Sequence, residues 1–304
     1  MYSIAEQFAA HLCGKVSTGT SRAYLSDVNG FLQAISFAGN TDAITDGAVE
    51  AYLGALREQG LKPATLNRKV SSINAFVKYL KQAELVEYSQ VQTQSLVVQN
   101  YLRPFPEFLS PADVDRLLQV PDLSTPTGLR DRAMMELIYA SGIQVKELLA
   151  LHPWQINFKK SRLVVEGKDG AQRSVPLYPQ CLQLLQRYCQ EVLSALPSDG
   201  EGASQDLLFR NLEGGPLSRQ GFCKQVRKYA ARAGLGEGAT AKALRQSFAA
   251  HLLQSGAPIQ NVQALVGHLT PQSTAFYHNA VRHAARTSYK KHHPKAKSGG
   301  GKKP

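Results

Sequence analysis

Apolar side chains recur every three or four residues along the first eighty positions, a spacing that places them on one face of a helix. Gly, Asn, Asp and Pro separate the runs, and Thr, Ser, Asp or Pro lies near the starts of several. The apolar positions are Ile4, Phe8, Leu12; Tyr24, Val28, Phe31, Leu32, Ile35; Val49, Tyr52, Leu53, Leu56; and Leu66, Val70, Ile73, Val77, Leu80. We therefore predict a bundle of amphipathic helices over residues 1–90.

The periodic pattern lapses between Ser89 and Phe108. This stretch is rich in Gln, and its Arg-Pro-Phe-Pro run at 103–106 cannot lie inside a regular helix. The pattern resumes at Ser110-Pro111, a favourable helix cap followed by proline in the first turn. We predict a helical domain over 1–90 and a linker over 91–108. A second domain over 109–290 and a basic, flexible tail over 291–304 complete the predicted organisation.

The second domain alternates between helical and strand-like patterns. Two strand-like runs, Arg162–Glu166 and Gln172–Leu177, flank a Gly-Lys-Asp-Gly segment that is typical of a hairpin turn. Helical patterns occupy 113–119, 129–141, 180–196, 218–233, 241–255 and 259–266. The predicted fold class is therefore mainly α, with a small antiparallel sheet in the second domain.

Composition and charge narrow the possible partners. Hydrophobic residues make up 43% of the 304 positions and charged residues 19%, which is ordinary for a globular protein. Lys and Arg number 35 against 23 Asp and Glu, a net charge of +12 that favours a polyanion such as nucleic acid. Simple solubility would explain the same excess. No apolar run approaches the ~18 residues of a membrane span, so no membrane partner is expected.

The chain ends and cysteines add two expectations about location. Residues 1–14 contain Glu6 and His11 and lack the basic start and long apolar run of a signal peptide. Four cysteines show no C-x-x-C spacing, which disfavours a structural zinc site or a disulfide framework. We expect a cytoplasmic protein without a metal.

Four motifs of the second domain, in this order, resemble the catalytic domain of the tyrosine recombinases, the phage integrase family with its Xer-type members. They are TGLRDR at 127–132 with SGIQVKEL at 141–148; Gly167-Lys168 with RSVPL at 173–177; KALRQSFAAHLL at 242–253; and Val266-Gly267-His268 with Tyr277. Residues 1–90 are similar to the family's SAM-like core-binding domain, although the likeness is weaker. The resemblance implies site-specific DNA recombination or integration by strand breaking and rejoining.

The resemblance also assigns roles to individual residues. Tyr277 matches the nucleophile that forms a 3′-phosphotyrosyl bond, so no cofactor or metal is implied. Arg245 matches an arginine that grips the phosphate, and His268 matches a histidine that contacts it. Lys168 matches the lysine that protonates the leaving oxygen. Lys242 stands where the family usually has His and where the related type IB topoisomerases have Lys.

Gln144 is the main departure from the family pattern. The family's G-x-R-x-x-E-L motif has its first catalytic Arg here, whereas Gly142, Glu147 and Leu148 are retained. An amide has no charge and no bidentate fork for phosphate, and loss of such an arginine slows phosphoryl transfer ~10³–10⁵-fold. This substitution leaves open a catalytically impaired DNA-binding relative with an accessory or regulatory role. A second alternative, an unrelated basic helical scaffold whose motif matches are coincidental, also stays open.

DNA binding should survive this substitution because phosphate contacts are spread over many cations. Candidate DNA-binding residues are Lys62, Thr65, Arg68 and Lys69, near the start of a predicted helix, and Arg173 in the second domain. The resemblance implies double-stranded DNA as the partner and a homo- or hetero-oligomer, a tetramer on synapsed sites. The DNA target, any partner recombinase and the biological process stay open.

Overall fold

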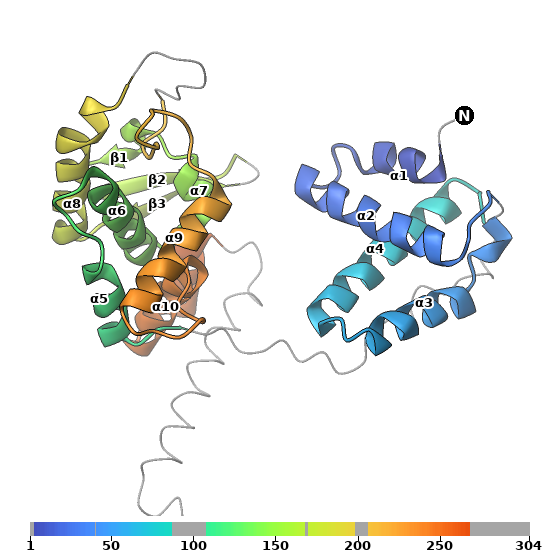
Figure 1. Ribbon diagram of the computed structural model, residues 1–304. Coiled ribbons are helices and arrows are strands. Elements are labelled where there is room, and N and C mark those ends of the chain that lie inside the picture. Colours follow the sequence, from blue (N-terminus) through green and yellow to red (C-terminus); the bar gives the residue numbers. More distant parts are fainter. Residues whose placement is uncertain (1–2, 40, 87–107, 168–169, 198–205, 268–304) are drawn as a thin grey trace, which may run out of the picture. The chain divides into compact units, whose positions relative to one another are not determined.

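The computed structural model describes residues 3–39, 41–86, 108–167, 170–197 and 206–267. The chain divides into two compact units, Met1–Arg103 and Pro104–Pro304 (Figure 1). Each unit has its own hydrophobic core, so each is described by itself.

Unit 1 is a helical bundle, as its sequence pattern predicts. Ser3, Ser17 and Thr45 cap three of its helices, each side chain accepting a hydrogen bond from a backbone N–H in the first turn. Phe8, Phe31 and other apolar residues from every helix close the core. The elements are α1 (Ile4–Leu12), α2 (Thr18–Ala34), a 3-10 turn (Thr41–Ala43), α3 (Asp46–Glu58) and α4 (Pro63–Gln82).

Unit 2 surrounds a small sheet with helices, and α6 lies at the centre of its core. Both α8 and α10 pack on α6, which is buried along most of its length (Figure 1). The helices are α5 (Pro111–Gln119), α6 (Pro126–Ser141), α7 (Val145–Leu149), α8 (Pro179–Glu191), α9 (Arg219–Arg232), α10 (Ala241–Gln254) and α11 (Ile259–Val266). Two 3-10 turns, Pro153–Gln155 and Leu193–Ala195, complete the described elements.

The sheet is antiparallel with strand order β1-β2-β3, formed by Ile156–Asn157, Arg162–Glu166 and Gln172–Pro176. Leu163 pairs with Val175 and Val165 pairs with Arg173. Because side chains alternate between faces, Arg173 shares the covered face with Val175. An arginine therefore enters the interior of unit 2 from the sheet.

The structure confirms the predicted fold class, a mainly helical chain with a small antiparallel sheet. It adds β1 and α7, which the sequence pattern did not predict. The predicted domain boundaries stay predictions, since most of the linker and the whole tail lie outside the described residues. None of the helices in the described ranges has the length and apolar character that crossing a bilayer demands.

Candidate active site

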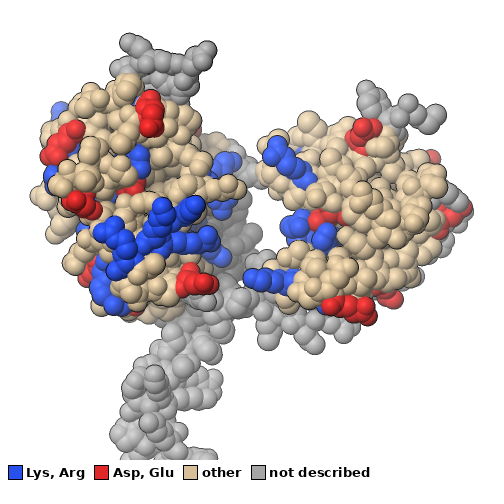
Figure 2. Space-filling view, in the orientation of Figure 1, with Lys and Arg blue, Asp and Glu red and all other residues tan. Residues whose placement is uncertain are grey.

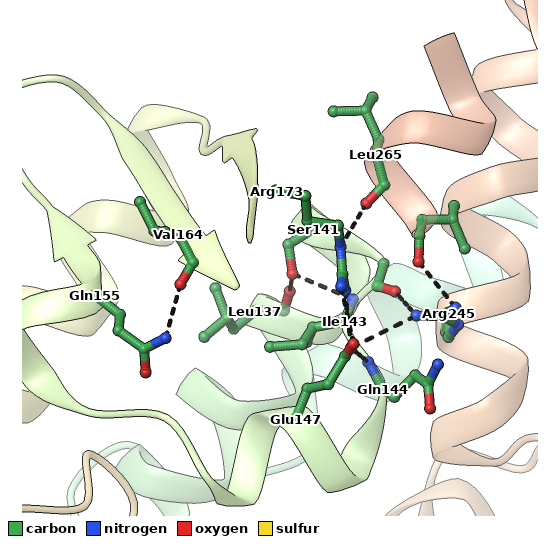
Figure 3. A network of polar contacts seen from close by, with 12 residues as sticks. Leu137, Ser141, Ile143, Gln144, Glu147, Gln155, Val164, Arg173, Arg245 and Leu265 are labelled. Carbon is green, nitrogen blue, oxygen red and sulfur yellow. Dashed lines mark hydrogen bonds and ion pairs between the residues drawn. The ribbon is translucent and has the colours of Figure 1, made fainter. Parts of the chain in front are cut away.

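Residues of the first, second and third motifs come together where four elements of unit 2 meet. Gln144 and Glu147 belong to α7, Arg173 to β3 and Arg245 to α10, while the carboxyl end of α11 lies beside them (Figure 3). Phosphoryl transfer depends chiefly on positioned cations, so the contacts that fix these two arginines define the site.

Glu147 is the centre of this network. Its two carboxylate oxygens accept hydrogen bonds from Nη1 and Nη2 of Arg173, each at 2.8 Å. Its Oε2 also accepts from the backbone N–H of Gln144 at 2.8 Å, and Nη1 of Arg245 lies 4.0 Å from it. A carboxylate at the start of α7 thus holds two guanidinium groups from other elements (Figure 3).

Arg245 connects the carboxyl ends of two helices. Its Nη1 donates to the carbonyl oxygen of Gly142, the residue that follows α6. Its Nη2 donates, at 3.1 Å, to the carbonyl oxygen of Val266, which is the last residue of α11. Carbonyl groups at helix ends lack partners within the helix and carry partial negative charge. The guanidinium satisfies one carbonyl from each end, and the side chain is only 11% exposed.

The charge of Glu147 is stabilised against its burial. Burial alone would raise the pKa of this carboxyl, but hydrogen bonds from Arg173 and Gln144, with the charges of Arg173 and Arg245, lower the pKa below its ordinary value. Glu147 therefore stays ionised at neutral pH. Two guanidinium groups face one carboxylate, which leaves the cluster with an excess of positive charge.

Gln144 and Lys242 differ from these buried groups. Gln144 caps α7, and its side chain is exposed beside the network (Figure 3). Lys242 is exposed in the first turn of α10, one helical turn before Arg245. Gln144 therefore starts the helix that carries Glu147, and Lys242 lies on the helix that carries Arg245.

Two of the predicted DNA-contacting residues, Arg68 and Lys69 of α4, have partners inside unit 1. The carboxylate of Asp27, 2% exposed, accepts from Arg68, from Nζ of Lys69 at 3.1 Å and from Ser72 at 2.9 Å. Arg68 is nevertheless 43% exposed, whereas Lys69 is 16% exposed. Their DNA contacts stay predictions, and the structure adds an internal role for both.

Exposed cations also gather on unit 2. Helix α9 contains no acidic residue, and its Lys and Arg side chains are exposed: Arg219, Lys224, Arg227, Lys228 and Arg232. Figure 2 shows Lys and Arg gathered on one face of this unit. Such a surface suits the phosphate backbone of a nucleic acid.

Lys168, His268 and Tyr277 lie outside the described residues. The flanks of Lys168 form the β2–β3 turn, in which the Gly167 N–H donates to the Ala171 carbonyl at 2.7 Å. Val266 and Gly267, the last described residues, precede His268. Within the described ranges, no group of three or more His, Cys, Asp or Glu could hold a metal ion.

Sequence reasoning missed the role of Arg173 at the centre of the site. The sequence suggests Arg173 only as one of several cations of the second domain that could contact DNA. The alternation of β3 contained the missing signal, because it places Arg173 on the face of Val175. Its side chain is 12% exposed, and its DNA contact stays a prediction.

Comparison with known proteins identifies the class to which this site belongs. A model of the phage integrase family matches residues 107–283, and a model of the phage integrase N-terminal SAM-like domain matches residues 5–84. The chain therefore belongs to the phage integrase family, the tyrosine recombinases. This finding confirms the predicted activity class, an enzyme of site-specific DNA recombination.

Similar proteins place the chain among the Xer-type members. Tyrosine recombinase XerD of Pseudomonas putida is 34% identical over 286 residues, which cover 92% of this chain and 93% of that protein. Tyrosine recombinase XerC of Roseiflexus sp. is 33% identical over 96% of this chain and 93% of its own length.

Solved structures share the fold at lower identity. XerH site-specific recombinase bound to palindromic difH substrate, a post-cleavage complex, has a TM-score of 0.78 at 19% identity and covers 94% of each chain. The Tn1549 transposon integrase in complex with transposon right end DNA has a TM-score of 0.74 at 15% identity, over 94% of this chain and 99% of the integrase.

Proposed function

We propose that this chain exchanges DNA strands at specific sites through a 3′-phosphotyrosyl intermediate at Tyr277. The observation that carries the proposal is the fixed position of Arg245. Contacts to α6, α7 and α11 hold its guanidinium immediately before the segment that continues to His268 and Tyr277. The family relationship and the retained motif residues support the same reaction.

The proposed reaction balances without a cofactor. The Tyr277 hydroxyl loses its proton to water as its oxygen attacks a DNA phosphorus, a bond from phosphorus to the tyrosyl oxygen forms, and the bond to the 5′-oxygen breaks. Lys168 supplies the proton that this oxygen needs. A 5′-hydroxyl of the exchanged strand then attacks the phosphotyrosine and releases Tyr277. Arg245 and His268 stabilise the charge on the non-bridging oxygens, with Lys242 as a further donor.

Gln144 lowers the rate in this proposal rather than replacing the function. An exposed amide beside Arg245 can donate one hydrogen bond to a phosphate oxygen but adds no charge. Loss of a preorganised donor costs about 10²–10³ in rate, and loss of an arginine can cost more. The accessory, non-cleaving role rests on this substitution, and the comparisons do not favour it.

Partners and location follow from the same proposal. Double-stranded DNA would contact Lys62, Thr65, Arg68 and Lys69 of unit 1 and the basic surface of α9 in unit 2. The λ integrase structure to which this chain is similar is a dimer bound to a core site, and we propose a homo- or hetero-oligomer that reaches a tetramer on synapsed DNA. A reducing cytoplasm would suit the free cysteines.

The test is covalent capture on DNA. The full chain is incubated with nicked duplexes carrying randomised sites, so that the fragment released by cleavage diffuses away, and denaturant-resistant adducts are counted. Tyr277→Phe should abolish the adduct, whereas Tyr289→Phe, a matched loss of a hydroxyl, should keep it. Gln144→Arg should raise the rate of adduct formation at least ~100-fold.

Either result assigns the function. An adduct that depends on Tyr277 establishes the nucleophile. DNA binding without an adduct in the natural chain, with an adduct after Gln144→Arg, would overturn the proposal in favour of the accessory role.

A further inference from the structure

We propose that Arg173 is a positioning residue, which together with Glu147 and Arg245 holds the carboxyl end of α11 in the active site. The proposal rests on the proposed function, because the segment after α11 contains His268 and Tyr277. It assigns to Arg173 an internal task in place of a phosphate contact.

All three guanidinium nitrogens of Arg173 donate hydrogen bonds inside unit 2. Nη1 and Nη2 donate to the two oxygens of Glu147, and Nε donates to the carbonyl of Leu265 at 3.0 Å. The neighbouring carbonyl, Val266, accepts from Arg245. Consecutive carbonyls at the end of α11 are therefore bound by two arginines, and both arginines lie against the carboxylate of Glu147.

Gly267 brings the backbone close to this guanidinium. It ends α11 with φ +74°, a left-handed conformation that glycine adopts without strain. A Cβ at this position would lie 2.9 Å from Nη1 and 3.0 Å from Cζ of Arg173. The backbone at Gly267 thus passes so close to the guanidinium that a side chain here would require the guanidinium to shift.

This arrangement makes the position of α11 dependent on β3. Helix α11 contacts β3 and α10, and its small core with α10 consists of Ala249, Val262 and Val266. Such a short helix has limited apolar burial, so hydrogen bonds at its end contribute strongly to its placement. Displacement of a reacting group by ~1 Å can slow catalysis about 100-fold.

The experiment compares Arg173→Ala with Arg130→Ala in the full chain. Arg130 is a matched control from the same unit: its side chain is 10% exposed, it donates two hydrogen bonds to Asp131 and a third to a backbone carbonyl, that of Arg210. Both variants lose a buried ion pair. Only Arg173→Ala also removes a hydrogen bond to the end of α11.

Two readouts separate positioning from general stability. The first is hydrogen exchange of the peptide over residues 259–267. The second is the single-turnover rate of adduct formation on the nicked duplexes, measured with the DNA affinity and its salt dependence. Arg173→Ala should speed exchange in this peptide and slow adduct formation about 100-fold, with affinity and salt slope unchanged. Arg130→Ala should alter neither readout, and Arg173→Lys should restore part of the rate.

A second pair of variants tests the contact with Gly267. Gly267→Ala should slow adduct formation more than Gly256→Ala, which has φ +87° and no heavy atom within 4 Å of the added Cβ. When Arg173 is also replaced by Ala, Gly267→Ala should slow adduct formation no more than Gly256→Ala does. The added Cβ at position 267 then has no guanidinium to displace.

Three results would overturn the inference or separate it from the proposed function. Equal effects of Arg173→Ala and Arg130→Ala would leave Arg173 a purely structural role. A salt slope reduced by ~0.9 in Arg173→Ala would make it a phosphate contact instead. If the unmodified chain forms no adduct, the proposed function fails. The inference about Arg173 is refuted separately, if hydrogen exchange over residues 259–267 is unchanged in Arg173→Ala.

Discussion

Replacement of Asp27 by Asn should destabilise unit 1 specifically. The carboxylate is 2% exposed, and it accepts from Arg68, Lys69 and Ser72 of α4. An amide keeps the shape and can still accept from Ser72, but it removes the charge opposite both cations. The change therefore isolates the ionic part of the contact between α2 and α4.

The expected cost is about 2–3 kcal/mol in the free energy of unfolding. Removing one partner of a fully buried ion pair costs ~3–5 kcal/mol. Solvent reaches Arg68, which is 43% exposed, and screens its share of the loss. Lys69 is 16% exposed, and although burial would lower its pKa, the Asp27 contact raises the pKa above its ordinary value. The loss thus comes mainly from Lys69.

Hydrogen exchange of the full chain measures this loss unit by unit. The most protected amides of α4 should lose about 2–3 kcal/mol of opening free energy, whereas amides of α6 in unit 2 should not change. Glu50→Gln, which removes a carboxylate charge at an exposed site of α3, is the matched control. If Asp27→Asn costs no more than Glu50→Gln, the reasoning from burial is wrong.

Further predictions concern unit 2. The fold lowers the pKa of Glu147, so the ionised carboxylate stabilises the fold above pH ~4.5. This stabilisation is lost as the pH falls through the lower pKa of the folded state. In Glu147→Gln, the free energy of unfolding measured with urea should therefore fall less steeply at acid pH. Burial lowers the pKa of His251, so stability should fall as pH drops below 6.5, and His251→Gln should abolish this step between pH 7 and 5. Gly142→Ala, with φ +62° and a Cβ 2.4 Å from a ring carbon of Phe248, should cost about 2–4 kcal/mol in denaturant unfolding. Gly256→Ala, where the Cβ meets nothing, should cost about 1 kcal/mol.

Each result has a contrary outcome. An acid limb unchanged in Glu147→Gln would assign the loss of stability to other carboxylates. A pH step that persists in His251→Gln would show that burial of this imidazole does not create it. Equal costs for the two alanine variants would mean that Phe248 moves aside freely.

Local signals predicted the helices and the hairpin well because caps, prolines and apolar spacing act over a few residues. Helix α11 lies at 259–266, as its pattern predicts, and Ser110 caps α5. The missed elements were too short for periodicity: α7 has five residues and β1 has two.

The sequence pointed to charged residues of the candidate site but not to the hydrogen bonds and ion pairs among them. Family motifs selected Arg245 and Gln144, whereas the ion pair of Glu147 with Arg173 joins residues 26 positions apart, one on α7 and one on β3. Likewise, Arg68 and Asp27 are 41 positions apart. Sequence shows the charges, but only tertiary packing determines which of them face one another.

The bridge from Arg245 to the carbonyl of Gly142 has a consequence for the order of synthesis. These residues are 103 positions apart, so at a ribosomal rate of ~5–20 residues per second the arginine is made about 5–20 s after its acceptor. The core of unit 1, which spans residues 5–86, is complete long before then. A nascent chain can therefore present a folded first unit while the contacts of Arg245 do not yet exist. We expect the arginine cluster around Glu147 to assemble after unit 1 has folded, so an unfinished chain would lack the recombination activity of the enzyme.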